Sequence, residues 1–373
     1  MRKEMAGKSK KGKWIILVLL IFSFAVCATA CENPEEQRGK QNLRMITDCV
    51  GREVEVPAEV EKIAALDSFA GEAMVMLGAG DQLVGTPNGV KQDKLLQEIY
   101  PDLVNLTVPM SGGTVNAETL LTIDPDVIFL KGDLYLNKGE LAKLDKLDIP
   151  YLVVRYTTMK EQMFAFHMIG TVLGGEKEKK AMEINEYYQE TIDLTGERAK
   201  QIPENEKLRV YHSIQEAVRT DGEDSLGADW TKNMGLTNVS VGENLTAEGS
   251  NYYCGMEQIF VWNPDVILCN DAMTKEYLLS TPKWAGLGAV AQKKVYNIPV
   301  GATRWGQQGS VETFFAMLWT GVTLYPEYYR DIDLKTEVMA FYKDYLGLAL
   351  DEQTYGMILS GQGIRTNGQN AGK

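Results

Sequence analysis

The sequence predicts an α/β protein with two similar lobes, each built on a parallel β-sheet, joined by a long helical segment. Short apolar runs alternate with helical patterns along the chain, which is typical of βαβ units. A helix–turn–strand phrase occurs twice, 139 residues apart. Between the two halves lies a helical pattern of unusual length for a compact lobe.

The N-terminal half begins with a hairpin pattern at 46–57 that turns at Gly51. Apolar runs then predict strands at 62–66, 83–85, 127–130 and 151–154. A helical pattern lies between the first two runs and ends at Gly78, a residue type common just after helices. We therefore expect an N-terminal α/β lobe at 43–157.

Residues 158–202 predict the connecting helical segment. Its apolar spacing is helical on both sides of an interruption at Gly174 and Gly175, and Pro203 ends it. Strand patterns resume at 208–212, 266–269 and 294–298, which predicts a C-terminal α/β lobe at 203–360. The tail at 361–373 is rich in glycine and asparagine, and we expect it to be disordered.

The repeated phrase reads ETLLTIDPDVIF at 118–129 and EQIFVWNPDVIL at 257–268. In each copy a glutamate stands near a helix N-terminus, where a negative charge is favourable. Pro125 and Pro264 then end the helix, and Asp-Val-Ile begins a buried strand. The agreement in spacing and identity predicts two lobes of similar construction.

The N-terminus has the pattern of an export signal at 1–30. Six basic residues precede an apolar run at 14–26, and Ala28 and Ala30 stand before Cys31. This arrangement resembles a bacterial lipoprotein signal, in which the cysteine is lipidated and becomes the new N-terminus. Residues 31–42 are polar and would form a flexible tether. The alternative is an uncleaved anchor helix.

Composition excludes several classes of function. Without residues 1–30 the chain has 32 basic and 50 acidic residues, which argues against binding to nucleic acid or to an anionic membrane surface. His167 and His212 are the only histidines, too few for a typical zinc or manganese site. Cys49, Cys254 and Cys269 show no close spacing, so free thiols are favoured over a disulfide.

The sequence resembles the substrate-binding lipoproteins of ABC importers for iron–siderophore, haem and cobalamin complexes, which have the class III periplasmic-binding-protein fold. The motifs that support the resemblance lie at 46–57, 77–85, 118–129, 234–239, 257–268, 284–299 and 325–334. The resemblance implies two Rossmann-like lobes, a rigid connecting helix and a ligand cleft between the lobes. It implies docking of Glu118 and Glu257 onto arginines of an ABC permease. It implies no cofactor and no enzymatic activity.

Ligands of open parallel sheets collect beyond the carboxyl ends of the strands, and this rule selects the ligand loops. Arg304 offers a planar fork for anionic oxygens, and Trp305 offers a flat apolar face. Lys131 and Arg219 would add positive charge. The expected ligand-binding residues are Ser68, Phe69, Asn88, Gly113, Thr114, Lys131, Tyr135, Arg219, Asn251, Tyr252, Arg304 and Trp305. The alternative for Arg304 and Trp305 is a surface ion pair beside a packing indole.

The sequence thus predicts a lipid-anchored receptor on the outer face of the cell membrane. A ferric siderophore is the preferred ligand, and cobalamin, haem and a small oxyanion such as molybdate are alternatives. A surface adhesin or sensor, or an exported hydrolase, would be a different class of function. The hydrolase has little support, because the Gly-x-Ser-x-Gly and His-Glu-x-x-His motifs are absent.

Overall fold

The computed structural model describes residues 42–361. The predicted export signal at 1–30, the lipidation site Cys31, and almost all of the tether and of the tail lie outside these residues. The described residues divide into two compact units, one of residues 42–44 and 57–59 and one of residues 45–56 and 60–361. The larger unit contains the helices between the lobes, the predicted C-terminal lobe, and all of the predicted N-terminal lobe except residues 43–44 and 57–59.

The N-terminal lobe contains a four-stranded parallel sheet in the order β4-β3-β7-β8. Its strands are β3 (Ile63–Ala65), β4 (Leu83–Gly85), β7 (Val127–Lys131) and β8 (Tyr151–Val154). Its helices are α3 (Ser68–Met76), α4 (Asn88–Lys91), α5 (Lys94–Ile99), α6 (Ala117–Ile123), α7 (Gly132–Leu136) and α8 (Lys138–Leu144). Strands are present at each of the positions that the sequence predicted.

The C-terminal lobe has a parallel sheet in the order β11-β9-β14-β15. Its strands are β9 (Arg209–Ser213), β11 (Thr237–Asn238), β14 (Val266–Cys269) and β15 (Val295–Asn297). Its helices are α11 (Leu226–Asn233), α12 (Met256–Trp262), α13 (Ala272–Ser280) and α14 (Gly288–Ala291). In both sheets the first strand lies between the second and the third, so the two lobes share one topology.

The repeated sequence phrase has the same structural role in both lobes. The backbone N–H of Asp126 donates to Lys62 O (2.8 Å), and its carboxylate accepts from Lys62 N (2.9 Å). Asp265 makes the same two contacts with Arg209, both at 2.8 Å. Each Pro-Asp pair therefore joins the end of a helix to the start of the first strand of the parallel sheet in its lobe.

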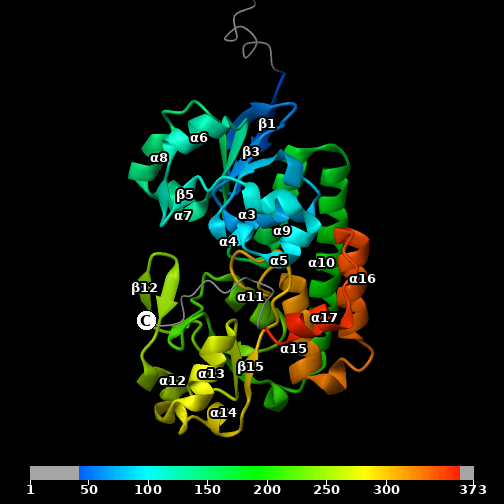
Figure 1. The fold of residues 1–373 in the computed structure, drawn as a ribbon. Coiled ribbons are helices and arrows are strands. Elements are labelled where there is room, and N and C mark those ends of the chain that lie inside the picture. The colour runs from blue at the N-terminus through cyan, green and yellow to red at the C-terminus, as the bar shows by residue number, and fades with distance from the viewer. Residues whose placement is uncertain (1–41, 362–373) are drawn as a thin grey trace, which may run out of the picture. The chain divides into compact units, whose positions relative to one another are not determined.

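The predicted connecting segment is helical, but it consists of two helices. They are α9 (Met159–Leu173) and α10 (Gly175–Gln201), separated at Gly174, where φ is +69°. Asn185 Nδ2 donates to Met163 O, and a Cβ at Gly170 would lie 2.5 Å from the Cβ of Ala181, so α10 packs back along α9. The connection is thus an antiparallel helix pair (Figure 1).

Three helices follow the C-terminal sheet at the end of the described residues. They are α15 (Thr313–Leu324), α16 (Leu334–Leu346) and α17 (Glu352–Leu359). The rings of Tyr187 on α10 and Phe314 on α15 have centroids 5.2 Å apart, and Figure 1 shows α16 alongside α10. Short 3-10 helices occur at Gly80–Gln82, Pro101–Asn105, Glu204–Glu206, Pro282–Trp284 and Pro326–Tyr328.

Antiparallel strands lie outside the two main sheets. The pairs are β1 (Leu43–Thr47) with β2 (Glu53–Pro57), and β5 (Met110–Ser111) with β6 (Thr114–Val115). In the C-terminal lobe β13 (Asn251–Tyr253) lies between β10 (Arg219–Thr220) and β12 (Thr246–Glu248). A short hairpin, β5–β6, thus precedes α6, and a longer one, β12–β13, precedes α12.

The core explains why the strands are apolar at successive positions. Val127 and Phe129 belong to the large cluster that also contains the residues of α9, α10 and α15, whereas Ile128 and Leu130 belong to a separate cluster in the N-terminal lobe. Strand β14 alternates in the same way between the large cluster and a second local one. Both sheets are therefore buried on both faces, as parallel sheets usually are.

Candidate ligand-binding site

The strongest candidate site lies where chain segments follow β7 and β8. Lys131 ends β7, and its Nζ lies 2.8 Å from Asp133 Oδ2 at the start of α7. Arg155 follows β8 directly and passes beside Gly132, where a Cβ would lie 3.0 Å from the Cβ of Arg155. The carboxyl edge of the N-terminal sheet therefore carries two cations next to one carboxylate.

The same carboxylate contacts the other lobe. Ser250, at the tip of the β12–β13 hairpin, donates from its hydroxyl to Asp133 Oδ2 at 3.0 Å. Burial alone would raise the pKa of Asp133, but its hydrogen bonds to Lys131 and Ser250 and the nearby charges outweigh burial, so the pKa lies below its ordinary value. Two loops that the sequence predicted as ligand loops, one from each lobe, are in direct contact here.

Three of the predicted ligand residues of the C-terminal lobe share one small sheet, β10-β13-β12. Arg219 on β10 pairs with Tyr253 on β13, and its guanidinium donates to Gln215 Oε1 at 2.8 Å. Asn251 and Tyr252 lie on β13, and the ring of Tyr252 covers Gly222, where a Cβ would lie 2.7 Å from it. This close contact holds the base of the hairpin whose tip carries Ser250.

Tyr135 lies on α7, two residues after Asp133, and its ring already contacts Arg52. The guanidinium of Arg52 stands 5.0 Å from the centroid of the Tyr135 ring and 4.5 Å from that of Tyr151, so it makes cation–π contacts with both rings. Tyr135 is half-buried against the core of the N-terminal lobe. One face of its ring is therefore used by Arg52 in the structure.

Phe69 and Trp305 are core residues, which corrects their interpretation as ligand-contacting aromatics. Phe69 is 1% exposed and lies 4.9 Å, centroid to centroid, from Tyr156. Trp305 is 0% exposed and packs against Phe315 of α15 at 5.0 Å. Neither ring presents a surface that a ligand could cover. For Trp305 the alternative of a packing indole describes the structure.

The loop with Trp305 also carries Arg304, which is half-buried. The loop is held from below by Glu312, whose carboxylate accepts from Thr303 N (2.6 Å) and from Tyr342 Oη (2.5 Å). Burial raises the pKa of Glu312 to about 7, against the effect of these hydrogen bonds. On its other side the loop donates from Gly309 N to Tyr156 Oη at 2.9 Å.

The remaining predicted ligand residues lie elsewhere on the surface or at helix starts. Asn88 is exposed at the start of α4, Gly113 and Thr114 are exposed in the β5–β6 hairpin, and Ser68 begins α3. Within residues 42–361, no hydrogen bond or ion pair links these four residues to Lys131, Asp133 or Ser250. Their role in ligand binding stays a prediction.

The two repeat glutamates occupy matched positions. Glu118 lies in the first turn of α6 and Glu257 in the first turn of α12, and both are exposed. Their helices end in left-handed residues with nearly equal φ, +45° at Asp124 and +43° at Asn263. The two carboxylates are thus presented by equivalent helices of the two lobes.

Sequence reasoning missed Arg155 and Asp133 as site residues. The signal for Arg155 was available, because it follows the predicted strand at 151–154 directly, at a carboxyl end. The signal for Asp133 was weaker. Asp133 lies between the predicted ligand residues Lys131 and Tyr135, but only its contact with Ser250 distinguishes it.

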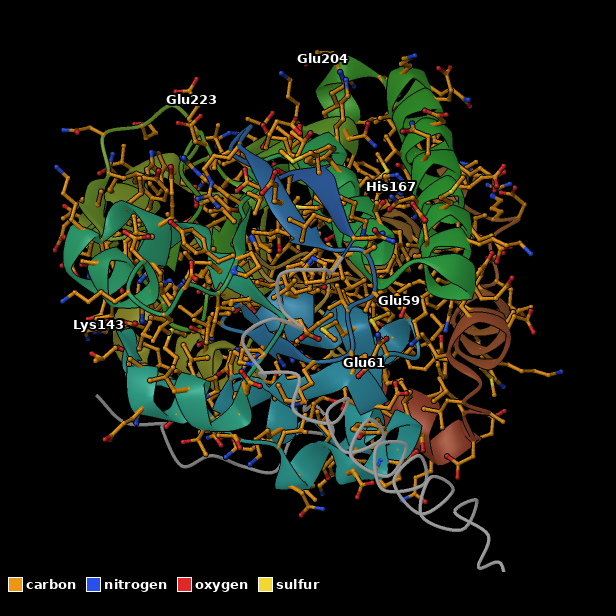
Figure 2. All side chains as sticks on the ribbon, turned by 90° about the horizontal axis from the view of Figure 1, so that it is seen from above. Glu59, Glu61, Lys143, His167, Glu204 and Glu223 are labelled. Carbon is orange, nitrogen blue, oxygen red and sulfur yellow. The ribbon has the colours of Figure 1, made fainter. Side chains whose placement is uncertain are left out.

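Neither histidine adds metal chemistry to this site. His212 is 1% exposed, and its Nδ1 lies 2.8 Å from Asp221 Oδ2. His167 is half-buried on α9, where Figure 2 labels it. In the part of the chain that the structure describes, no group of three or more His, Cys, Asp or Glu side chains could hold a metal ion.

The cysteines and the helices complete the description. Cys49, Cys254 and Cys269 carry free thiols, as the sequence favoured. Burial raises the pKa of Cys49 to about 12, so this thiol stays protonated at neutral pH.

Among residues 42–361, no helix has both the length and the apolar character that a membrane span requires.

A family model described as periplasmic binding protein matches residues 63–300, which include both main sheets and the connecting helices. The chain belongs to the periplasmic binding protein family. It is 24% identical over 326 residues to the molybdate-binding protein MolA of Haemophilus influenzae, covering 81% of this chain and 90% of MolA. It is 24% identical over 303 residues to the ABC transporter substrate-binding lipoprotein YvrC of Bacillus subtilis, covering 78% of this chain and 90% of YvrC.

Solved structures of this family share the fold. The structure of Haemophilus influenzae MolA bound to molybdate aligns with a TM-score of 0.70 at 21% identity, covering 83% of this chain and 99% of MolA. The vitamin B12 binding protein BtuF of Vibrio cholerae aligns with a TM-score of 0.55 at 21% identity, covering 71% of this chain and 96% of BtuF. The predicted fold class and family resemblance are therefore confirmed.

Proposed function

We propose that this protein captures a small anionic ligand outside the cytoplasm and delivers it to the permease of an ABC importer. The main observation in support is the contact between Asp133 and Ser250, which brings a loop of each lobe together beside Lys131 and Arg155. In a solute-binding family, a cationic group at the carboxyl edge of a parallel sheet is a natural place for an anion.

A ferric siderophore remains the preferred ligand. Catecholate and carboxylate siderophores form ferric complexes with net negative charge, which a lysine and an arginine can pair with. A small oxyanion such as molybdate is the second candidate, and the similarity to MolA supports it. Cobalamin and haem are less favoured, because the indole of Trp305 is buried in the core and offers no flat aromatic face to such a ligand.

Delivery requires docking and an anchor. We propose that Glu118 and Glu257 contact basic residues of the permease, since both are exposed on equivalent helices. We further propose that Cys31 carries the lipid anchor and that the protein performs no reaction on its ligand. Support for this last point comes from the family, whose relatives are named for binding and not for catalysis.

The ligand is tested by thermal unfolding of residues 32–373 with ferric siderophores, molybdate, cobalamin and haem. A ligand at one hundred times its Kd should stabilise the protein by about 2.7 kcal/mol and raise Tm accordingly. The double variant Lys131→Ala, Arg155→Ala should lose the shift. Lys143→Ala is the matched control, because Lys143 (labelled in Figure 2) also pairs with a carboxylate, that of Glu140 on α8.

A rise in Tm with cobalamin or haem alone would contradict the proposal that the ligand is anionic. A chain that binds no solute but recognises a protein or a surface would instead be an adhesin or sensor. Turnover of a tested compound would show an enzyme.

Docking is tested separately by uptake in cells. The double charge reversal Glu118→Arg, Glu257→Arg should abolish uptake while ligand affinity stays the same, because neither residue lies at the candidate site. Glu98→Arg with Glu276→Arg is the control, with one exposed glutamate per lobe on other helices. Normal uptake by the first double variant would show that the docking assignment is wrong.

A further inference from the structure

Asp133 holds two groups that could bind a ligand. Its carboxylate lies 2.8 Å from Lys131 Nζ and accepts a hydrogen bond from the Ser250 hydroxyl at 3.0 Å. The side chains of Lys131 and Asp133 are 47% and 48% exposed, so both can be reached from solvent. A carboxylate with two polar partners, one from each lobe, occupies the place that an anionic ligand would need.

The hairpin that carries Ser250 is anchored at its base and exposed toward its tip. Tyr252 of β13 covers Gly222, and β13 pairs with β10 through Arg219 and Tyr253. The residues of β12 are all exposed. In Figure 1, β12 stands on the side of the C-terminal lobe that faces α7, in agreement with the hydrogen bond to Asp133. The hydrogen bond between Ser250 and Asp133 can therefore break while the base of the hairpin stays in place.

We propose that Asp133 is a specificity-determining residue that takes the place of the anionic group of the ligand in the ligand-free protein. This inference rests on the proposed function. An anion with at least two acceptor oxygens can replace the carboxylate at Lys131 and at Ser250. Asp133 then turns away, because two negative charges beside one cation repel each other. A neutral ligand gains nothing from this exchange, so the site selects for negative charge.

Arg155 supplies a second cation for this exchange, and Gly132 leaves the space for its side chain. Because Gly132 has no Cβ, the side chain of Arg155 can pass close to the start of α7. Its positive charge acts on Asp133, together with the charge of Lys131. When an anion pairs with Lys131, the carboxylate of Asp133 can keep a favourable interaction with Arg155. The release of Asp133 therefore leaves no unpaired charge at the edge of the sheet.

The first test measures binding of molybdate and of a ferric catecholate siderophore by calorimetry at low salt. Asp133→Asn should tighten the binding of the anionic probe by about two- to fivefold, the range expected for loss of a competing exposed ion pair. Asp145→Asn is the matched control, because Asp145 in the same lobe also accepts a side-chain hydrogen bond, from Tyr151 Oη at 3.1 Å. Weaker or unchanged binding by Asp133→Asn would overturn the inference.

The second test needs no ligand. Hydrogen exchange of the amides at 246–253 should be faster in Ser250→Ala than in the wild type, because the tip of the hairpin loses its contact with Asp133. Ser111→Ala, in the exposed β5–β6 hairpin of the other lobe, should leave this exchange unchanged. Unchanged exchange in Ser250→Ala, with normal ligand binding, would overturn the inference and leave the proposed function standing. A wild type that binds no anion would contradict the proposed function itself.

Discussion

The N-terminal and C-terminal lobes use the same sheet order and the same Pro-Asp anchor, but they differ in the segments that precede their matched helices. In the N-terminal lobe a short hairpin, β5–β6, precedes α6. In the C-terminal lobe the β12–β13 hairpin joins β10 in a three-stranded sheet and reaches Asp133. The repeated parts build the scaffold, and of the two segments that differ, the β12–β13 hairpin reaches the candidate site.

The two lobes resemble each other in how they hold the loops beyond their strands. Asp67 caps α3 in the N-terminal lobe by accepting from Ala70 N, and Glu312 binds the loop with Arg304 from inside the protein. Both carboxyls are buried. The loops of both lobes therefore depend on buried acids, although no local sequence pattern distinguishes these two acids from the many exposed ones.

The largest expected effect is on stability. It concerns the two aromatic residues that the sequence placed at the ligand site and that the structure buries in the core. Phe69→Ala in one lobe and Trp305→Ala in the other should each lower the free energy of unfolding by about 3–5 kcal/mol, the cost typical of a buried aromatic truncated to alanine. Urea denaturation measures both values. Normal stability together with lost ligand binding, in either variant, would restore that residue to the ligand site.

The next effect is a pH dependence that the two lobes share. Burial raises the pKa of Asp67 from 3.8 to about 6 and that of Glu312 from 4.5 to about 7. The folded state therefore favours the protonated acid. The stabilisation that each protonated acid contributes is complete below the pKa of the acid in the unfolded chain. It declines as the pH rises through the pKa of the acid in the folded protein. Each acid should contribute a loss of about 3 kcal/mol across its window.

Replacement of each acid by its amide separates the two windows. Denaturation of Glu312→Gln at a series of pH values should show less loss of stability than the wild type between pH 4.5 and 7. Asp67→Asn should show less loss between pH 3.8 and 6. A variant whose pH profile runs parallel to that of the wild type would mean that the replaced carboxyl titrates normally.

A smaller effect should distinguish the two Pro-Asp anchors. Asp126 accepts from two backbone N–H groups, Glu61 and Lys62, whereas Asp265 accepts from Arg209 alone. Asp126→Ala should cost about 1–2 kcal/mol, and Asp265→Ala about half as much, because solvent can partly replace these exposed bonds. Chemical denaturation of the two single variants is the measurement. Equal costs would mean that the additional hydrogen bond from Glu61 N to Asp126 adds no stability.

The smallest effect concerns the helix caps of the repeat. Asn116 caps α6 by accepting from Thr119 N, whereas Gly255 gives α12 no side-chain cap. Gly255 has φ −76° and ψ 152°, a conformation that suits a capping residue. Gly255→Asn should therefore stabilise the protein by about a few tenths of a kcal/mol, and Asn116→Gly should destabilise it by a similar amount. Thermal unfolding of both variants measures the difference, and a lower Tm for Gly255→Asn would contradict this view of α12.

The sequence predicted the scaffold well, because buried parallel strands leave a continuous apolar signal. Residues 127–130 alternate between two core clusters, so each position must be apolar, and the run was recognisable. The repeat was recognisable because Asp126 and Asp265 do the same physical work in each lobe. The helix pair was harder to predict. Gly174 marked an interruption, but the packing of Gly170 against Ala181 depends on contacts between the helices.

The candidate site was predictable only at the level of loops. Gly301 and Gly306 flank the predicted ligand residues Arg304 and Trp305, and glycines allow a loop to approach a ligand closely. In the structure they approach other parts of the protein instead. A Cβ at Gly301 would lie 2.3 Å from Tyr342 Oη, and one at Gly306 would lie 2.8 Å from the Cβ of Ala316. Whether a glycine serves a ligand or a neighbouring helix depends on tertiary packing that the local sequence does not contain. The contact between Asp133 and Ser250 joins residues 117 positions apart and was hidden for the same reason.

Strand β12 pairs with β13 on one side only, so it ends its sheet with a row of backbone groups open to solvent. Such an edge can accept a strand from another molecule, and natural proteins discourage this by keeping edge strands short and charged. β12 is three residues long and ends in Glu248, so it meets both conditions. The segment that reaches across to the other lobe is thereby also protected against aggregation, and lengthening it or replacing Glu248 with an apolar residue would weaken that protection.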